Sequence, residues 1–130
     1  MGVGMPAALK LDLFADLLWE VFGNTAYLVG SALSDKSGWR DVDIRSILTD
    51  KEYERWFPGL NPDDTHRCAK WCGLVLAFTE LGKTMTGLPI DFQIDQQTYA
   101  NSHHKGPRSA LGFVEHRFRE RVTPYPGATP

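Results

Sequence analysis

Apolar residues recur between Pro6 and Phe22 at intervals of three and four, which is the spacing of one face of an α-helix. One row consists of Leu9, Leu13, Leu17 and Val21, and a second row beside it consists of Phe14, Leu18 and Phe22. Acidic side chains occupy the largely opposite face. The pattern predicts an amphipathic helix of about four turns that ends at Gly23-Asn24 and covers one face of a sheet.

Three short apolar segments have the pattern of β-strands. Residues 25–29 are apolar on both faces, which predicts a central strand. In residues 41–48 and 88–94 apolar and polar side chains alternate, so each segment predicts a strand with one polar face.

Further helices are predicted between and after these strands. A long helix is expected from Asp63 or Asp64 to about Leu81, with Gly82 closing it. Its buried stripe would consist of Trp71, Leu74, Val75 and Phe78. Shorter helices are expected over residues 31–37, over 51–57 behind a cap at Asp50, and over 113–122, with Phe113 pointing inward. The predicted fold class is therefore α/β (α+β), a small mixed β-sheet of three or more strands flanked by helices.

Acidic side chains gather on the polar faces of two predicted strands. Asp41 and Asp43 are two residues apart, so they share one face of their strand. Two like charges on one face repel each other unless a cation neutralises them. Asp91 lies on the polar face of the strand over 88–94 and would join them if the two strands are neighbours. Because carboxylates are hard oxygen ligands, the sequence predicts a site for Mg²⁺ or Mn²⁺ at these three residues.

The turn at Gly30 and Ser31 joins the first strand to the predicted helix over 31–37. Free N–H groups and a hydroxyl at a helix N-terminus can bind an anion. An ordinary serine cap would look the same, and the position of the turn ahead of Asp41 favours the anion site. Lys36 and Arg40 either contact phosphate oxygens or are solvated loop charges, and both alternatives stay open.

These residues together resemble the signature of the nucleotidyltransferase superfamily typified by DNA polymerase beta, in its small single-domain form. That signature is an apolar residue, Gly, Gly or Ser, a gap of roughly nine to thirteen residues, and an Asp-apolar-Asp/Glu-apolar run, with a third acid on a later strand. The matching positions are Val29-Gly30-Ser31, a nine-residue gap, Asp41-Val42-Asp43-Ile44 and Asp91. The resemblance covers about residues 25–95.

The resemblance implies metal-dependent transfer of NMP from an NTP to a hydroxyl by a two-metal mechanism. Asp41 and Asp43 would ligate both ions, and Asp91 would ligate the catalytic ion and help deprotonate the acceptor. Gly30 and Ser31 would hold the β- and γ-phosphates. Asp35 stands where the family often has a basic residue, which motivates an alternative: a catalytically lapsed module that binds nucleotide or a protein partner. A third hypothesis is metal-dependent phosphoester hydrolysis, with water as the acceptor.

Length and charge limit the remaining classes of function. The 130 residues predict one nucleotidyltransferase-like domain over 1–122 and a flexible tail over 123–130. A formal net charge of -2 provides no broad cationic field for tight binding of duplex DNA. No apolar run approaches the ~18 residues of a membrane span, so a cytoplasmic protein is expected. Cys68 and Cys72 fit no zinc pattern and are expected to be reduced, core-facing thiols.

The acceptor has no obvious binding domain in this chain. Fewer than 40 residues follow Asp91, so the acceptor, whether a small molecule, a protein or an RNA end, would be held by the tail, a second subunit or a partner protein. His103 and His104 are adjacent and therefore a poor pair of metal ligands. Lys105 and Arg108 form the most basic loop and could contact a phosphate or the acceptor.

One further basic residue lies on the acidic face. Arg45 shares the polar face of Asp41 and Asp43. It would either pair with a carboxylate or reach the nucleotide, and the sequence leaves both alternatives open.

Overall fold

The computed structural model describes residues 4–30 and 41–113. Its elements, in chain order, are α1 (Ala7–Phe22), β1 (Ala26–Val29), β2 (Val42–Leu48), α2 (Asp50–Trp56), the 3₁₀ helix η2 (Pro62–Arg67), α3 (Ala69–Thr86), β3 (Ile90–Gln96), α4 (Gln97–His103) and β4 (Ser109–Ala110). The predicted helix over 31–37, most of the one over 113–122 and the predicted tail lie outside the described residues.

The strands form one mixed sheet in the order β3-β2-β1-β4. β1 runs antiparallel to both β2 and β4, whereas β2 and β3 are parallel. The predicted fold class, a small mixed sheet flanked by helices, is confirmed. β1 also has a neighbour on each side, as its apolar faces predict, although the two-residue strand β4 was not foreseen.

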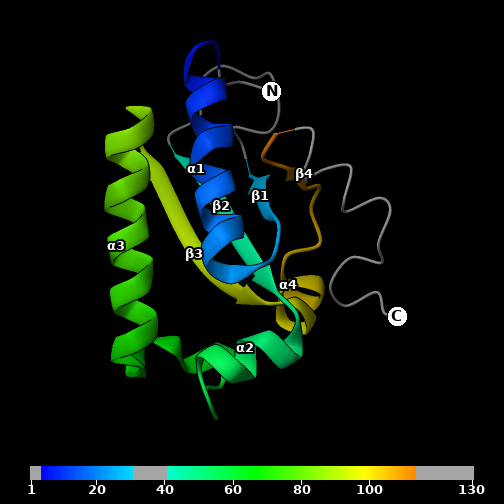
Figure 1. Cartoon of the computed structure of the whole chain (residues 1–130). Coiled ribbons are helices and arrows are strands. Elements are labelled where there is room, and N and C mark those ends of the chain that lie inside the picture. The colour runs from blue at the N-terminus through cyan, green and yellow to red at the C-terminus, as the bar shows by residue number, and fades with distance from the viewer. Residues whose placement is uncertain (1–3, 31–40, 114–130) are drawn as a thin grey trace.

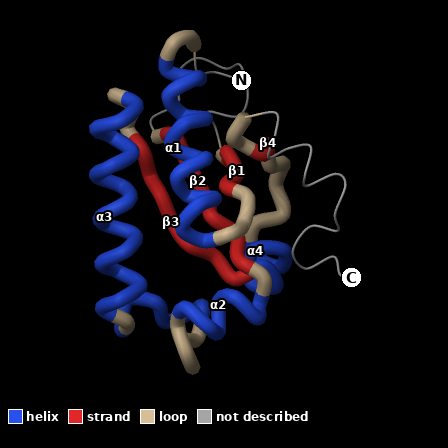
Figure 2. Tube along the Cα trace, viewed as in Figure 1, coloured by secondary structure: helices blue, strands red, loops and turns tan. Residues whose placement is uncertain are grey.

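Two long helices cover one face of this sheet. Figure 1 shows α1 crossing in front of the strands with α3 alongside it, and Figure 2 shows the same layering by element type. Phe92 of β3 lies at the centre of the core, with Phe14 of α1 at a ring-centroid distance of 6.3 Å and Phe78 of α3 at 6.0 Å. The opposite face of the sheet is therefore the one left for polar side chains.

Of the two apolar rows predicted for α1, the row of Phe14, Leu18 and Phe22 is buried as expected, whereas the other row is not. The buried residues of α1 are Leu11, Phe14, Ala15, Leu18 and Phe22, whereas Leu9 and Leu13 are 45% and 50% exposed. Two apolar rows compete for the core, and the row with two phenylalanines removes more apolar area from water, so it faces inward. The helix does end at Gly23, which adopts a left-handed conformation with φ 71°.

The boundaries of α3 also correct the prediction. The residues after Asn61 form η2, and α3 begins at Ala69, where the Cys68 sulfur accepts a hydrogen bond from the Trp71 N–H at 3.4 Å. Gly82 does not end the helix, which runs on to Thr86 and stops at Gly87, φ 72°. The predicted stripe is half-buried against the core.

Three smaller expectations were also wrong. The cap of α2 is Thr49 rather than Asp50, because the Thr49 hydroxyl accepts a hydrogen bond from the Glu52 N–H at 3.1 Å. Phe113 is 39% exposed rather than inward-facing. β3 continues to Gln96 and leads directly into α4, which the sequence did not predict. Among the described helices, none combines the length and the apolar character needed to cross a membrane.

Candidate metal centre and adjoining pocket

Pairing between β2 and β3 places two of the predicted metal ligands side by side. The parallel register sets Asp43 directly opposite Asp91. On either side of Asp43, Val42 and Ile44 are fully buried toward the helices, and strand alternation therefore turns both carboxylates to the other face. The expectation that these strands are neighbours is confirmed.

The third acidic residue, Asp41, immediately precedes β2. One carboxylate oxygen from each of Asp41, Asp43 and Asp91 can be chosen so that all three oxygens lie within 4.8 Å of one another. Asp41 is exposed and the other two are partly buried, so the cluster is open to solvent on one side. An all-oxygen, open set of this kind fits a hard divalent cation such as Mg²⁺ or Mn²⁺.

The electrostatics of the cluster favour a cation. Burial raises the pKa of the Asp43 carboxyl, and the charges of Asp91 and Asp41, together with a side-chain hydrogen bond to Asp91, raise it further. The Arg45 guanidinium opposes this shift without cancelling it. A raised pKa means that the fold disfavours the ionised form of Asp43, and a bound cation would reverse that preference.

Gly30 lies against Asp43 of the aspartate cluster, directly after β1. Val29 pairs with Asp43 across the antiparallel register, and Gly30 then turns the chain with φ 76°. A Cβ atom at Gly30 would overlap Oδ2 of Asp43. Both the backbone conformation and the space therefore require glycine here. Its predicted partners in phosphate binding, Ser31, Lys36 and Arg40, lie outside the described residues.

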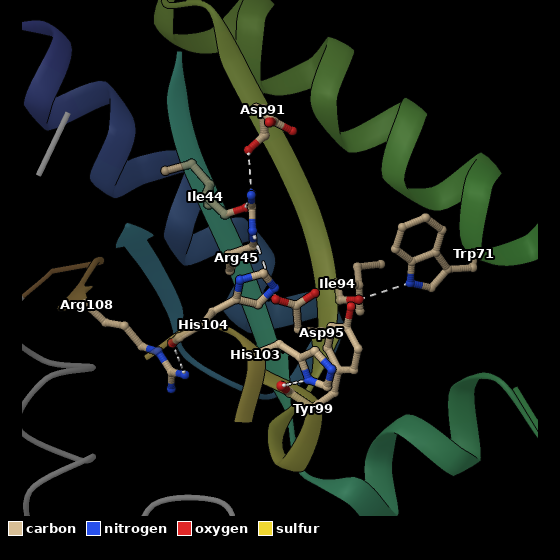
Figure 3. Close-up of polar contacts among 10 residues, drawn as sticks. All are labelled: Ile44, Arg45, Trp71, Asp91, Ile94, Asp95, Tyr99, His103, His104 and Arg108. Carbon is tan, nitrogen blue, oxygen red and sulfur yellow. Dashed lines mark hydrogen bonds and ion pairs between the residues drawn. The ribbon is translucent and has the colours of Figure 1, made fainter. Parts of the chain in front are cut away.

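Arg45 pairs with a carboxylate that the sequence analysis missed. Its Nη1 donates to the backbone carbonyls of Ile44 and Asp91, each at 3.1 Å, and its Nε lies 4.0 Å from Oδ2 of Asp95 (Figure 3). Asp95 is a buried acid, 6% exposed. The prediction ended the strand at residue 94, whereas the two-residue spacing of Asp91, Gln93 and Asp95 would have placed Asp95 on the same polar face.

A pocket of about 540 Å³ lies on this face and includes Asp43 of the aspartate cluster in its lining. Its lining includes Gly30 and Asp43, then Arg45 two residues farther along β2, Asp95 near the end of β3, and the segment from His103 to Arg108 that follows. Burial raises the pKa of Asp95, and the positive charges of Arg45, His104 and Arg108 act against that shift. The pocket therefore joins an acidic end to a basic end.

The two histidines take separate roles in this pocket. The ring of His103 stacks on Tyr99 at a centroid distance of 4.1 Å, and its Nδ1 lies 3.1 Å from the Tyr99 carbonyl oxygen. His104 follows the end of α4, beside Asp95 and Arg45 (Figure 3). Within residues 4–30 and 41–113, the three-ligand cluster of aspartates is the one that could hold a metal, and no histidine or cysteine belongs to it.

Comparison with other proteins identifies no family for this chain. No protein-family model, no curated protein and no solved structure matches the chain. The class of protein is therefore argued from the geometry of the site and from the sequence signature.

Proposed function

We propose that this protein is a metal-dependent nucleotidyltransferase that moves NMP from an NTP to a hydroxyl of an acceptor. The observation that carries the proposal is the convergence of Asp41, Asp43 and Asp91, whose oxygens lie within 4.8 Å of one another. Support also comes from Gly30, because the absence of a side chain at this position leaves room for the Asp43 carboxylate. The pocket volume of about 540 Å³ is within the range of small-ligand sites.

In the proposed reaction, the acceptor oxygen attacks the α-phosphorus of the NTP and forms a new P–O bond. The bond from that phosphorus to the bridging oxygen breaks, and pyrophosphate leaves with the electron pair. Asp41, Asp43 and Asp91 would hold Mg²⁺ or Mn²⁺, which neutralises charge that accumulates on the phosphate oxygens. Asp91 would help to accept the proton of the attacking hydroxyl, because it lies directly opposite Asp43, which lines the pocket.

Metal-dependent nucleotide binding tests this proposal without knowledge of the acceptor. Thermal unfolding is measured with each of the four NTPs, with and without Mg²⁺ or Mn²⁺, for the wild type and Asp43→Asn. A ligand at about 100 times its dissociation constant stabilises a protein by about 2.7 kcal/mol. At about 3–5 °C per kcal/mol for a domain of this size, we expect an increase in Tm of about 8–14 °C that requires the metal.

The matched control is Asp63→Asn, because Asp63 is an exposed acid on η2, away from the pocket. The control variant should keep the metal-dependent shift, whereas Asp43→Asn should lose it. A wild type that responds to no NTP, or an Asp43→Asn variant that responds fully, contradicts the proposal. Release of pyrophosphate in the presence of candidate acceptors then distinguishes a transferase from a module that only binds nucleotide.

A further inference from the structure

The pocket carries positive charge at the end away from the aspartates. His103, His104, Lys105 and Arg108 line that end, and Arg45 lines the middle. Asp95, the one acidic residue among them, faces Arg45 at 4.0 Å. One negative charge therefore meets three fixed positive charges, those of Arg45, Lys105 and Arg108, even when both histidines are neutral.

Neither Lys105 nor Arg108 forms an ion pair within 4.0 Å in the described part of the chain. Arg108 donates from Nη1 to the Asn101 side-chain oxygen at 3.0 Å and from Nη2 to the His104 carbonyl at 3.2 Å. These contacts hold the guanidinium in place at the end of α4 but do not neutralise it. Among the described residues, Lys105 forms no ion pair. The basic end thus offers an anion two hydrogen-bond donors: the Arg108 guanidinium, whose orientation is fixed, and the Lys105 ammonium group, which can adjust its position.

We infer that the basic end of the pocket, Lys105 and Arg108 with His104, binds the phosphate group of a phosphate-bearing acceptor. This inference rests on the proposed transfer reaction and names the class of its second substrate. A small phosphorylated molecule fits a pocket of about 540 Å³. Its phosphate lies at the basic end, so its hydroxyl can extend along the pocket toward Asp43.

The separation of negative and positive charge indicates which substrate binds at which end of the pocket. Phosphates held next to three carboxylates need metal ions between the two sets of negative charges. The donor triphosphate therefore belongs to the acidic end, where the aspartates supply metal ligands. An anion without a metal is repelled from that end and is neutralised where arginine and lysine are available.

The first measurement uses inorganic phosphate as the probe, in buffer free of divalent metal. Calorimetric titration compares the wild type with Lys105→Gln, which is an exposed residue without an ion pair in the described segments and should not disturb folding. Loss of one charge-assisted hydrogen bond should weaken phosphate binding roughly tenfold. Lys51→Gln, an exposed lysine on α2 outside the pocket, should bind phosphate like the wild type.

Absence of phosphate binding to the wild type, or equal binding by wild type and Lys105→Gln, overturns the inference. A second variant, Arg108→Gln, removes the other cation that is proposed to bind phosphate. It too should weaken phosphate binding at least tenfold. Its folding is checked by circular dichroism, because Arg108 also contacts Asn101 and His104.

The second measurement separates acceptor from donor. Metal-dependent stabilisation by NTP should be the same in Lys105→Gln as in the wild type. If Lys105→Gln loses that stabilisation, the basic end binds the donor triphosphate and the assignment to the acceptor is wrong. If phosphate binding depends on Lys105 while Asp43→Asn still responds to NTP and metal, the basic site stands and the proposed transfer reaction fails.

Discussion

Replacement of Gly82 by alanine tests how closely α1 and α3 pack over the sheet. A Cβ atom at Gly82 would lie 2.9 Å from Cζ and 3.0 Å from Cε2 of Phe14, and 3.3 Å from Cγ1 of Ile90. Favourable contacts between carbon atoms lie at about 3.5–4.0 Å. Phe14 is fully buried and its ring meets Phe92 edge to face, so it has no free space into which to move.

Two opposing terms set the size of the effect. Alanine is favoured over glycine inside a helix by about 1 kcal/mol. Overpacking a closed core costs about 1–3 kcal/mol, and the crowding of three atoms of two residues places this site within that range. Gly82→Ala is therefore expected to change the free energy of unfolding by between zero and about −2 kcal/mol.

Gly73 provides the matched control on the same helix. It is exposed, and nothing lies within 4 Å of a Cβ atom built there. Gly73→Ala should therefore raise the free energy of unfolding by about 1 kcal/mol, which is the full difference in helix propensity between alanine and glycine. The difference between the two variants isolates the packing term, because helix propensity and unfolded-state entropy change equally in both.

Urea unfolding followed by circular dichroism measures both variants, and an unchanged slope confirms that only stability has changed. Each kcal/mol corresponds to about 3–5 °C in Tm for a domain of this size. If Gly82→Ala is stabilised as much as Gly73→Ala, α3 does not touch Phe14 at this point and the packing that positions β3 is wrong. A Phe14→Leu background should relieve the clash and reduce the difference between the variants.

Three further predictions concern the site and its surroundings. Asp43→Asn should raise the Tm of the metal-free protein at pH 7 but not near pH 3. The reason is that burial, and then Asp91, raise the pKa of Asp43, so the stability linked to its protonation is present at acid pH and is lost as the pH rises through that pKa. An equal change at both pH values would contradict this. Gly30→Ala should weaken the metal-dependent response to NTP, because its Cβ would overlap Oδ2 of Asp43, and an unchanged response would rule that overlap out. Tyr53→Phe should keep or raise stability by up to about 1 kcal/mol, because the Tyr53 hydroxyl is buried without a hydrogen-bond partner in the described part of the chain. It should also remove a step near pH 12 from the ultraviolet absorbance titration, since burial raises the pKa of Tyr53 to about 12, and persistence of the step would assign it to another residue.

The polar face of the sheet could be predicted from the sequence because strand geometry has a fixed period. Alternation places Asp43 on the polar face of β2 and Asp91 on the polar face of β3. The register that pairs them is a tertiary feature, and the signature with its third acid is what pointed to neighbouring strands. The three carboxylates were therefore predictable as a group.

Helix details were less predictable, because several faces and end points compete. On α1 two apolar rows differ by less than one turn, and only packing against Phe92 selects the row of Phe14. At Gly82 a glycine marks close contact with Phe14 rather than a helix end, and sequence alone does not distinguish these uses. The basic end of the pocket was missed because α4 was not predicted, and α4 is the element that precedes His104 and Arg108, whose charges act on Asp95.

The charges along the described strands β2 and β3 favour a bound cation at the three aspartates. Along the paired strands, Asp43 stands opposite Asp91, two residues later Arg45 stands opposite Gln93, and two residues beyond Gln93 lies the buried Asp95. Arg45 could have neutralised the aspartates, but its Nη1 is held by the Ile44 and Asp91 carbonyls and its Nε faces Asp95. Arg45 therefore lowers the pKa of Asp43 only in part, and that pKa stays raised. A divalent ion at the aspartates would supply the missing charge without breaking the Arg45–Asp95 pair, so metal binding and an intact basic end are compatible within one pocket.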